Sequence, residues 1–403
     1  MAHKIKITID STNRGIRDDI QITEGNGKEA MVLDLEEFAS IYDFSHNQPL
    51  IDEIARKISD AYHNLNKTSI WFDMGGEGFN FRCLHTMDKV VKSLIKNFGF
   101  LNGNMYYRSG AMDVPENYNL YLQHCIKFGW VPVNVSCGNP YEAGMQISLN
   151  ADVATDNNLV PRIKNKIFTS YNRAPRDHRL YIIGEILRRR LDKKSYFSAY
   201  INANEDLAFH DETSDFSFLR DSLPKTWEKV SESLRVNYKR FPIKLNLKAN
   251  HTASDYMNVT DNDINHYTES YFHLITETKF FHDPIKTDPI LHHHGVALDC
   301  FFANEKTYKA IIGKVPFILV GLTGSLAALK SRGYKTFHPY IDESYDLIYD
   351  DEDRLEAIMN EVTRLSKFKK EEWLEWQENI IPILQHNYNI IKSRSYLGWQ
   401  LRS

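Results

Sequence analysis

Cysteine is scarce in this chain of 403 residues. The four cysteines, Cys83, Cys125, Cys137 and Cys300, lie far apart and form no C-x-x-C pair. This spacing excludes a zinc ribbon and a dense disulfide framework. We therefore expect reduced thiols and a cytoplasmic protein.

Long apolar runs are also missing. The most apolar window, residues 315–329, contains two glycines and is shorter than the roughly 20 residues that a membrane-spanning helix needs. The first residues do not form a continuous apolar signal region, so we expect no membrane span. The net charge of −4 argues against a protein that coats nucleic acid by bulk electrostatics, although it allows a local basic groove.

The composition is that of an ordinary folded protein, with 42% hydrophobic and 25% charged residues. Strand and helix patterns alternate along the chain, which is typical of α/β folds. In the first part, strands are expected at 3–9, 68–74 and 129–135 and helices at 50–65 and 87–98. Later strands are expected at 166–170, 195–199, 271–278 and 315–321.

A polar stretch at 151–164 predicts a linker, because it lacks periodicity and ends near a proline. We therefore predict a first domain over 1–160 and a second over 161–370. Residues 202–262 are polar and irregular, and we interpret them as an insertion in the second domain. The helical pattern near the C-terminus predicts helices over 371–403 that pack back on the first domain.

The first candidate site residues follow the strand at 166–170. Asn172, Arg173, Arg176, His178 and Arg179 open a helix there. Ligands of open α/β sheets bind at the carboxyl ends of strands, and arginines there can neutralise a diphosphate through bidentate contacts. The alternative is a solvated helix start with salt bridges.

Two further groups have the same placement. Thr276 and Glu277 end the apolar strand at 271–278, where the carboxylate can accept hydrogen bonds from sugar hydroxyls or simply cap the next turn. Glu305, Lys306, Thr307 and Lys309 open the helix before the strand at 315–321. A carboxylate, a hydroxyl and helix N-terminal amides on one turn suit a ligand with hydroxyls and phosphates, such as a nucleotide-sugar. Glu305 and Lys306 can instead be a structural ion pair.

These segments resemble glycosyltransferases of the two-Rossmann-domain (GT-B) architecture. The similarity covers about residues 166–351 and rests on Asn172–Arg179, on Leu274-Ile275-Thr276-Glu277-Thr278, and on Phe301–Lys309 before Pro316-Phe317-Ile318-Leu319-Val320-Gly321. It is closest to phage and marine-microbe enzymes with an F-x-T-E-K-T-x-K-P-I stretch, and more distant from fucosyltransferase and exostosin donor motifs. Asn304 stands where that family often has threonine, and Ala310 where it often has proline.

The resemblance implies an α/β fold of two Rossmann-like domains facing a cleft, with the nucleotide-sugar donor in the second domain. Glu277 and Glu305 would then orient the donor, while Arg173, Arg176 and Lys306 would offset charge on the leaving diphosphate. It also implies a metal-independent transferase with no cofactor apart from the donor substrate. The three consecutive histidines His292–His294 alternate in direction on an extended chain and do not suggest a shared metal, although His294 can line the cleft.

The acceptor site is expected in the first domain, in the loop Asp73-Met74-Gly75-Gly76-Glu77-Gly78. Glycines let a substrate approach the backbone, and an acid there can deprotonate an acceptor hydroxyl. Glu77 is the preferred general base, followed by Asp73 and then His85. The alternative is a tight turn with a solvated glutamate.

Two basic clusters in the sequence allow more than one kind of acceptor. The first contains Arg188–Arg190, Lys193 and Lys194. The second contains Lys239, Arg240, Lys244 and Lys248, with the aromatic residues Tyr238 and Phe241 among them. Such clusters are exposed helix faces or bind a nucleic-acid strand. Three hypotheses follow: a glycosyltransferase acting on a carbohydrate or small acceptor, a phage enzyme modifying hydroxymethylated DNA bases in the host cytoplasm, and a non-catalytic nucleotide-sugar-binding module.

Overall fold

The computed structural model describes most of the chain. The described residues are 3–5, 9–10, 15–16, 30–34, 47–64, 68–74, 81–109, 111–137, 142, 156–172, 175–199, 216, 218–245, 261–281 and 300–400. The chain forms two compact units. The first contains Met1–Pro140, Pro289–Phe302 and Trp399–Ser403, and the second contains Tyr141–Asp288 and Ala303–Gly398.

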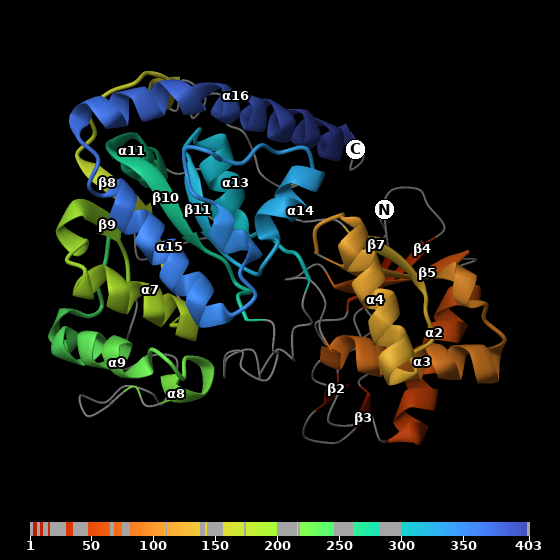
Figure 1. Cartoon of the computed structure of the whole chain (residues 1–403). Helices are drawn as coiled ribbons and strands as arrows, with labels where there is room; N and C mark the ends of the chain where they lie inside the picture. Colours follow the sequence, from red (N-terminus) through yellow and green to blue (C-terminus); the bar gives the residue numbers. More distant parts are fainter. Residues whose placement is uncertain are drawn as a thin grey trace. The chain divides into compact units, whose positions relative to one another are not determined.

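The first unit is built on a five-stranded sheet in which every neighbouring pair is parallel. Its strands lie in chain order, β1 (His3–Ile5), β4 (Ala30–Asp34), β5 (Ser69–Met74), β6 (Met105–Ser109) and β7 (Asn134–Cys137). Helices α2 (Gln48–Asn64), α3 (Phe81–Phe98) and α4 (Pro115–Phe128) connect the later strands (Figure 1). Because right-handed crossovers that all advance in one direction put their helices on one face, these helices share one side of the sheet. A short hairpin pairs β2 (Ile9–Asp10) with β3 (Gly15–Ile16).

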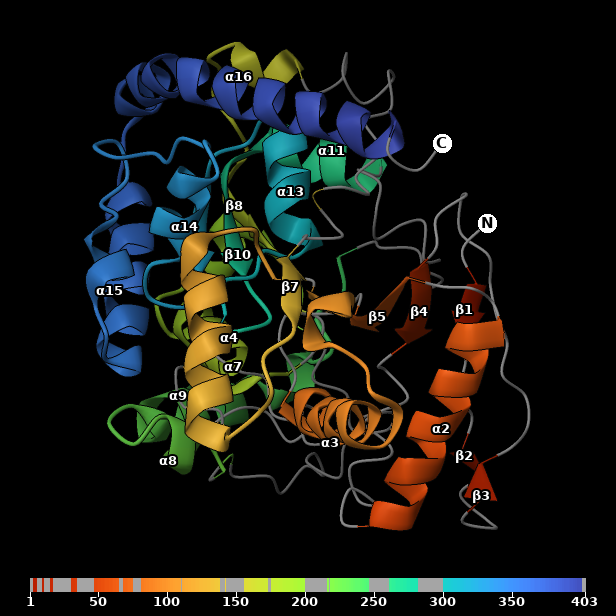
Figure 2. The same ribbon diagram turned by 90° about the vertical axis from the view of Figure 1, so that its right-hand side faces the viewer.

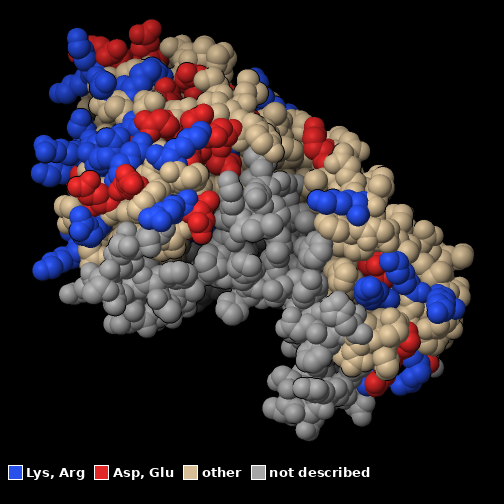
Figure 3. Space-filling view, turned by 60° about the horizontal axis from the view of Figure 1, so that its bottom comes forward, with Lys and Arg blue, Asp and Glu red and all other residues tan. Residues whose placement is uncertain are grey.

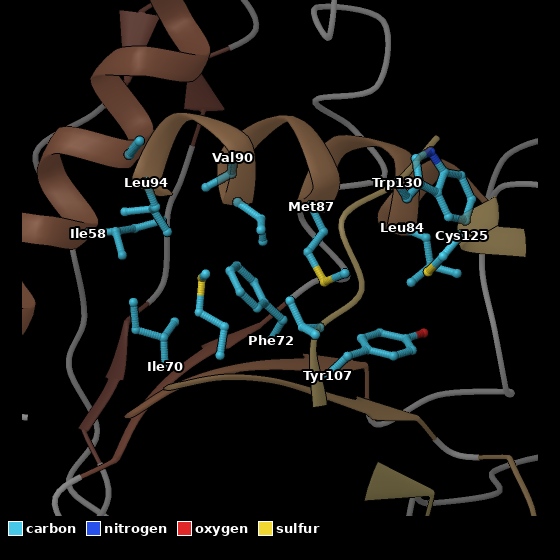
Figure 4. Packing of buried hydrophobic residues seen from close by; sticks show 14 of the residues in the cluster. Ile58, Ile70, Phe72, Leu84, Met87, Val90, Leu94, Tyr107, Cys125 and Trp130 are labelled. Atoms are coloured by element: carbon cyan, nitrogen blue, oxygen red, sulfur yellow. The ribbon is translucent and has the colours of Figure 1, made fainter. Parts of the chain in front are cut away.

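The core of the first unit lies between this sheet and its helices (Figure 4). Ile70 and Phe72 are buried while Trp71 between them is half-buried, as the alternation of a strand requires. Helix α3 presents Met87, Val90 and Leu94 to the same core, at the spacing of one helix face. Helix α4 begins with proline in its first turn and ends at Gly129, whose φ of 64° is the left-handed conformation that favours glycine.

A hydrogen-bonded contact to α4 holds the segment around Phe301, which belongs to the first unit although it comes late in the chain. The buried side chain of Asn117 on α4 accepts a hydrogen bond from Phe301 N at 2.8 Å and donates to Phe301 O at 3.0 Å. Phe301 O also accepts from Met112 N at 2.9 Å. Asn117 therefore pairs with Phe301 as a neighbouring backbone would.

The second unit contains a four-stranded parallel sheet in the order β11–β10–β8–β9. The strands are β8 (Lys166–Ser170), β9 (Ser195–Phe197), β10 (Ser270–Thr276) and β11 (Phe317–Val320). The chain goes from β8 to β9 on one side, then returns past β8 to β10 and continues to β11. The direction of winding therefore reverses between β8 and β10, which is a topological switch point.

This reversal puts helices on both faces of the second sheet. Helix α7 (Asp177–Arg188) packs against α15 (Asp351–Leu365), and Figure 2 shows α15 on one side of the strands, with α11 (Asp261–Glu269) and α13 (Glu305–Ile312) on the other. All residues of β10 are buried, as expected for a parallel strand covered on both faces. The remaining helices of this unit are α8 (Leu219–Ser222), α9 (Trp227–Val236), α14 (Ser325–Ser331) and α16 (Lys370–Gln400).

The long helix α16 is anchored on the second unit. Trp373 stacks on Tyr271 of β10 with ring centroids 3.9 Å apart and planes 7° from parallel. Gln377 donates to Arg162 O at 2.9 Å, and Asn387 bonds both the N–H and the C=O of Lys335. These contacts explain why the chain up to Gly398 belongs to the second unit.

The coarse prediction of an α/β protein with Rossmann-like parallel sheets in two domains is confirmed. The division differs from the predicted one: it falls after Pro140 rather than at 160, and residues 371–398 group with the second unit rather than forming a separate segment.

The prediction that residues 202–262 are an insertion outside the core is wrong for the described part of this segment. Val230 and Leu234 of α9 are fully buried, and a Cβ added at Gly184 of α7 would lie 3.1 Å from Val230. Among the described residues, no helix is both long and apolar enough to cross a bilayer.

We expect Phe72→Ala to lower the free energy of unfolding by about 3 to 5 kcal/mol, because it removes a fully buried ring and leaves a cavity. Leu122→Ala on α4 is the control, since Leu122 is 48% exposed and should change stability by less than about 0.5 kcal/mol. Urea unfolding followed by circular dichroism measures both. Equal midpoints for the two variants would contradict this account of the core.

Candidate functional site

The carboxyl ends of β8, β9 and β10 are tied together by one buried residue, Asn172, through its backbone N–H and its side chain. Asn172 lies just beyond β8, and its Oδ1 accepts a hydrogen bond from Thr276 Oγ1 at 2.8 Å. Its backbone N–H donates to Ser198 Oγ at 3.0 Å, and its Nδ2 donates to Ser170 Oγ at 3.1 Å. The candidate site thus lies at the switch point, where ligands of open α/β sheets bind.

Glu277 connects this edge to the start of helix α13. It follows β10, is 2% exposed, and accepts hydrogen bonds from Asn304 N at 3.0 Å and from Thr307 Oγ1 at 2.5 Å. Asn304 is the N-cap of α13, and its side chain accepts from Lys306 N at 2.9 Å. The carboxylate of Glu277 therefore holds the first turn of α13 against the end of β10.

The electrostatics of this network follow from burial. Burial raises the pKa of Glu277 to about 7, although the Thr307 hydroxyl, Lys306 and the Asn304 amide act in the opposite direction. Burial also lowers the pKa of Lys306, against the influence of Glu305. For Glu305, burial acts to raise the pKa, but the ion pair with Lys306 at 3.1 Å outweighs it and the pKa falls. Lys306 is thus shared between two carboxyl groups in a setting of low polarity.

The basic residues at the start of α7 contact the backbone after β10. Arg179 donates to Thr276 O at 3.3 Å and to Glu277 O at 3.2 Å, and Arg176 donates to Thr278 O. His178 Nε2 donates to Glu277 O at 3.0 Å, and its ring stacks on Phe280. Burial, reinforced by both arginines, lowers the pKa of His178 well below its usual value, so the imidazole is neutral. These bonds hold the loop after β10 in place.

The structure brings most of the predicted donor residues into one network at the switch point. Its members are Asn172, Arg176, Arg179, Thr276, Glu277, Glu305, Lys306 and Thr307. Lys309, one turn further along α13, forms an ion pair with Asp263 of α11 at 3.3 Å.

The other predicted residues are not brought into this network. Arg173, Glu77 and His292–His294 lie outside the described residues. The backbone of Asp73 is in β5, where it pairs with Asp34 and Arg108, but its side chain is not among those described. His85 is half-buried on α3, with its ring 6.5 Å from that of Trp130.

Exposure divides the network into two sets. Asn172, Thr276, Glu277 and Thr307 are almost completely buried, and their side chains are hydrogen-bonded in two pairs, Asn172 with Thr276 and Glu277 with Thr307. The side chains of Glu305 and Lys306 are 16% and 14% exposed, and Arg176 is half-buried. The buried set therefore positions the partly exposed set, and only the latter reaches the surface where a ligand would bind.

Sequence reasoning missed two residues that shape this edge. Arg354 is 1% exposed; it donates to Phe280 O at 2.9 Å and to Ile348 O at 2.9 Å, and it pairs with Asp351 at 2.6 Å. Asp346 accepts hydrogen bonds from the amides of Leu326 and Ala327, so it already occupies the N-terminus of α14. Arg354 lies among three acidic residues at a helix start, and the sequence does not show which distant carbonyls such a cation binds.

Within the described ranges, no group of three or more His, Cys, Asp and Glu side chains is placed to hold an ion.

The buried carboxyl of Glu277 predicts a defined pH dependence. Its pKa is about 7 in the folded protein and near 4.5 in the unfolded chain, so between these values only the folded state keeps the proton. Stability is therefore lost as the pH rises through this window, and the loss is complete above pH 7. Glu277→Gln cannot ionise, so its free energy of unfolding relative to the wild type should rise by about 3 kcal/mol between pH 5 and pH 8.

Glu305→Gln is the matched control, measured by urea unfolding at the same pH values. The pKa of Glu305 is lowered, so its stabilising contribution is present above the unfolded pKa and disappears only as the pH falls further. Its difference from the wild type should change much less than that of Glu277→Gln from pH 5 to pH 8, because Glu305 has the smallest effect among the groups that shift the pKa of Glu277. A constant difference for Glu277→Gln would show that Glu277 is ionised throughout.

Comparisons of this chain with family models, with curated proteins and with solved structures found no match. What the site binds is therefore inferred from the chemistry and the placement of its side chains.

Proposed function

We propose that the chain is a glycosyltransferase of the GT-B architecture that binds a nucleotide-sugar at the switch point of its second unit. One observation carries the proposal. Lys306 and Glu305 reach the surface at the start of α13, and a buried network of Glu277, Asn304 and Thr307 holds that turn against the end of β10. A cation and a carboxylate side by side suit a ligand that carries both phosphates and hydroxyls.

The donor's diphosphate is assigned to Lys306 and Arg176. Lys306 lies in the first turn of α13, whose N-terminal partial positive charge also favours an anion. Arg176 lies at the start of α7 and binds Thr278 O in the loop after β10. Glu305, at the first helical position, is placed to accept hydrogen bonds from ribose or sugar hydroxyls. Arg179 is 4% exposed and bonded to two carbonyls, so it contributes its charge to the local field rather than a direct contact.

In the proposed reaction an acceptor hydroxyl attacks the anomeric carbon of the donor sugar. The new glycosidic bond forms as the bond to the diphosphate breaks, and the hydroxyl proton passes to a general base. Negative charge then builds up on the diphosphate, and Lys306 and Arg176 stabilise it without reorganising, because the buried network fixes the turn beforehand. Glu77, with Asp73 as the second choice, stays the predicted base in the first unit.

Lys306→Ala should weaken the binding of a nucleoside diphosphate at least tenfold, or about 1.4 kcal/mol, because it removes the cation nearest the proposed phosphate position. Isothermal titration calorimetry with a panel of nucleoside diphosphates measures this loss. Lys335→Ala is the control, since Lys335 is exposed and lies outside this network. Thermal melting checks that both variants fold. An unchanged affinity of Lys306→Ala for nucleoside diphosphates would contradict a donor site at this position.

Turnover separates an enzyme from a binding module. Incubation with a panel of nucleotide-sugars, without an acceptor, should release nucleoside diphosphate by slow hydrolysis, and Glu77→Ala should reduce transfer to an acceptor without changing diphosphate affinity. Thermal stabilisation by nucleoside diphosphates without any turnover would instead identify a non-catalytic nucleotide-sugar-binding module.

A further inference from the structure

A group of exposed cations lies on the second unit, around the end of α7, the start of β9 and the turn after α9. Lys and Arg side chains gather along the left-hand edge of Figure 3, with acidic side chains among them. The basic surface is defined here as six exposed residues: Arg190, Lys193, Lys194, Lys239, Arg240 and Lys244. They lie on and around two 3-10 turns, η4 (Asp192–Lys194) and η5 (Tyr238–Arg240).

The two turns are neighbours in space although they are far apart in the sequence. Arg240 Nη2 donates to Asp192 Oδ2 at 2.8 Å, which joins η5 to η4. Just beyond them, Ala199 and Ile243 exchange backbone hydrogen bonds of 3.0 and 2.9 Å in an antiparallel bridge. The cations of both turns therefore form one continuous surface.

This surface has an excess of positive charge that the fold does not use. Cations at the nearby helix end are paired: Arg188 and Arg189 both contact the buried carboxylate of Glu185 at 2.7 Å, and Arg189 also pairs with Glu356 at 2.8 Å. On the basic surface, Arg240 pairs with Asp192. Within the described ranges, the other five cations make no ion pair.

Arg190 gives a second, independent indication. Its φ is 55°, the left-handed conformation that favours glycine at the end of a helix. The residue is exposed, and helix α7 would end there with less steric cost if it were glycine. An arginine held in this conformation adds a cation to the basic surface just before η4, and this points to a function for that charge.

Aromatic residues stand next to these cations in the sequence. Tyr196 follows Lys194 by two positions, and Tyr238 and Phe241 flank Lys239 and Arg240; all three aromatic residues are half-buried. Lys166, outside the basic surface as defined, has its Nζ 5.4 Å from the ring centroid of Tyr196. Interleaved cations and aromatic rings suit a strand whose phosphates pair with lysine and whose bases stack on side chains. We propose that the basic surface binds the sugar-phosphate backbone of a nucleic-acid strand. This proposal does not depend on the donor site.

The test uses a fluorescently labelled single-stranded DNA of mixed sequence and fluorescence anisotropy at salt concentrations from 50 to 200 mM. The logarithm of the association constant should fall linearly with the logarithm of the salt concentration, by about 0.7 for each phosphate contacted. The triple variant Lys193→Gln, Lys194→Gln, Lys239→Gln should bind at least tenfold more weakly, with a slope smaller by about 2.

The control is the triple variant Lys367→Gln, Lys369→Gln, Lys370→Gln. It removes the same charge from exposed positions of the same unit, so it reports bulk electrostatics alone. A loss of DNA affinity confined to the Lys193, Lys194 and Lys239 variant supports the proposal. An equal loss of DNA affinity in both variants, or no loss in either, overturns it. Binding of phosphatidylserine vesicles that depends on the basic surface, without DNA binding, also overturns it in favour of a membrane surface. Nucleoside diphosphate affinity should be the same in both variants, so this test and that of the donor site fail separately.

Discussion

The second unit depends on one buried carboxyl group. Glu277 lies where β10 ends, and its two oxygens accept hydrogen bonds from Asn304 and Thr307, so the first turn of α13 cannot move independently of the sheet. Its burial is costly for an ionised carboxylate, and the raised pKa of Glu277 is the consequence. The same hydrogen bonds hold Glu305 and Lys306 in a single geometry at the surface. Side chains on a flexible turn would not have a fixed geometry of this kind.

The loops around this carboxyl group are fixed by cationic side chains as well as by apolar packing. Arg179 and Arg354 are buried, and Arg176 is half-buried. Arg176 and Arg179 bind the carbonyls after β10 from α7, and Arg354 binds the carbonyl of Phe280 from α15. A buried arginine is retained only where it is well paired, because an unpaired one costs several kcal/mol. The edge of the second sheet is thus rigid before any ligand arrives, as electrostatic stabilisation of a leaving group requires.

The two proposals concern different parts of the second unit. The donor site lies at the carboxyl ends of β8 and β10, and the basic surface lies around η4 and η5, next to β9 and the end of α9. If both are correct, a nucleic acid is a candidate acceptor, and the hypothesis of a DNA-modifying transferase gains weight over one that acts on free carbohydrate. If only the donor site is correct, the acceptor is to be sought among smaller molecules.

The α/β class and the positions of the polar residues at strand ends can be predicted from the sequence, because both follow from local periodicity and from where each apolar run stops. What those residues contact depends on how the strands are ordered in the folded chain. The order β11–β10–β8–β9 puts Asn172 beside Thr276, more than a hundred positions apart, and turns Arg179 from an expected phosphate ligand into a partner of backbone carbonyls. The neighbour of α9 was equally hidden: Val230 and Leu234, four residues apart, mark one apolar helix face, but only the folded structure shows that α7 covers it at Gly184. Which groups a side chain bonds or packs against depends on contacts between segments that are distant in the sequence, and a local sequence pattern does not contain this information.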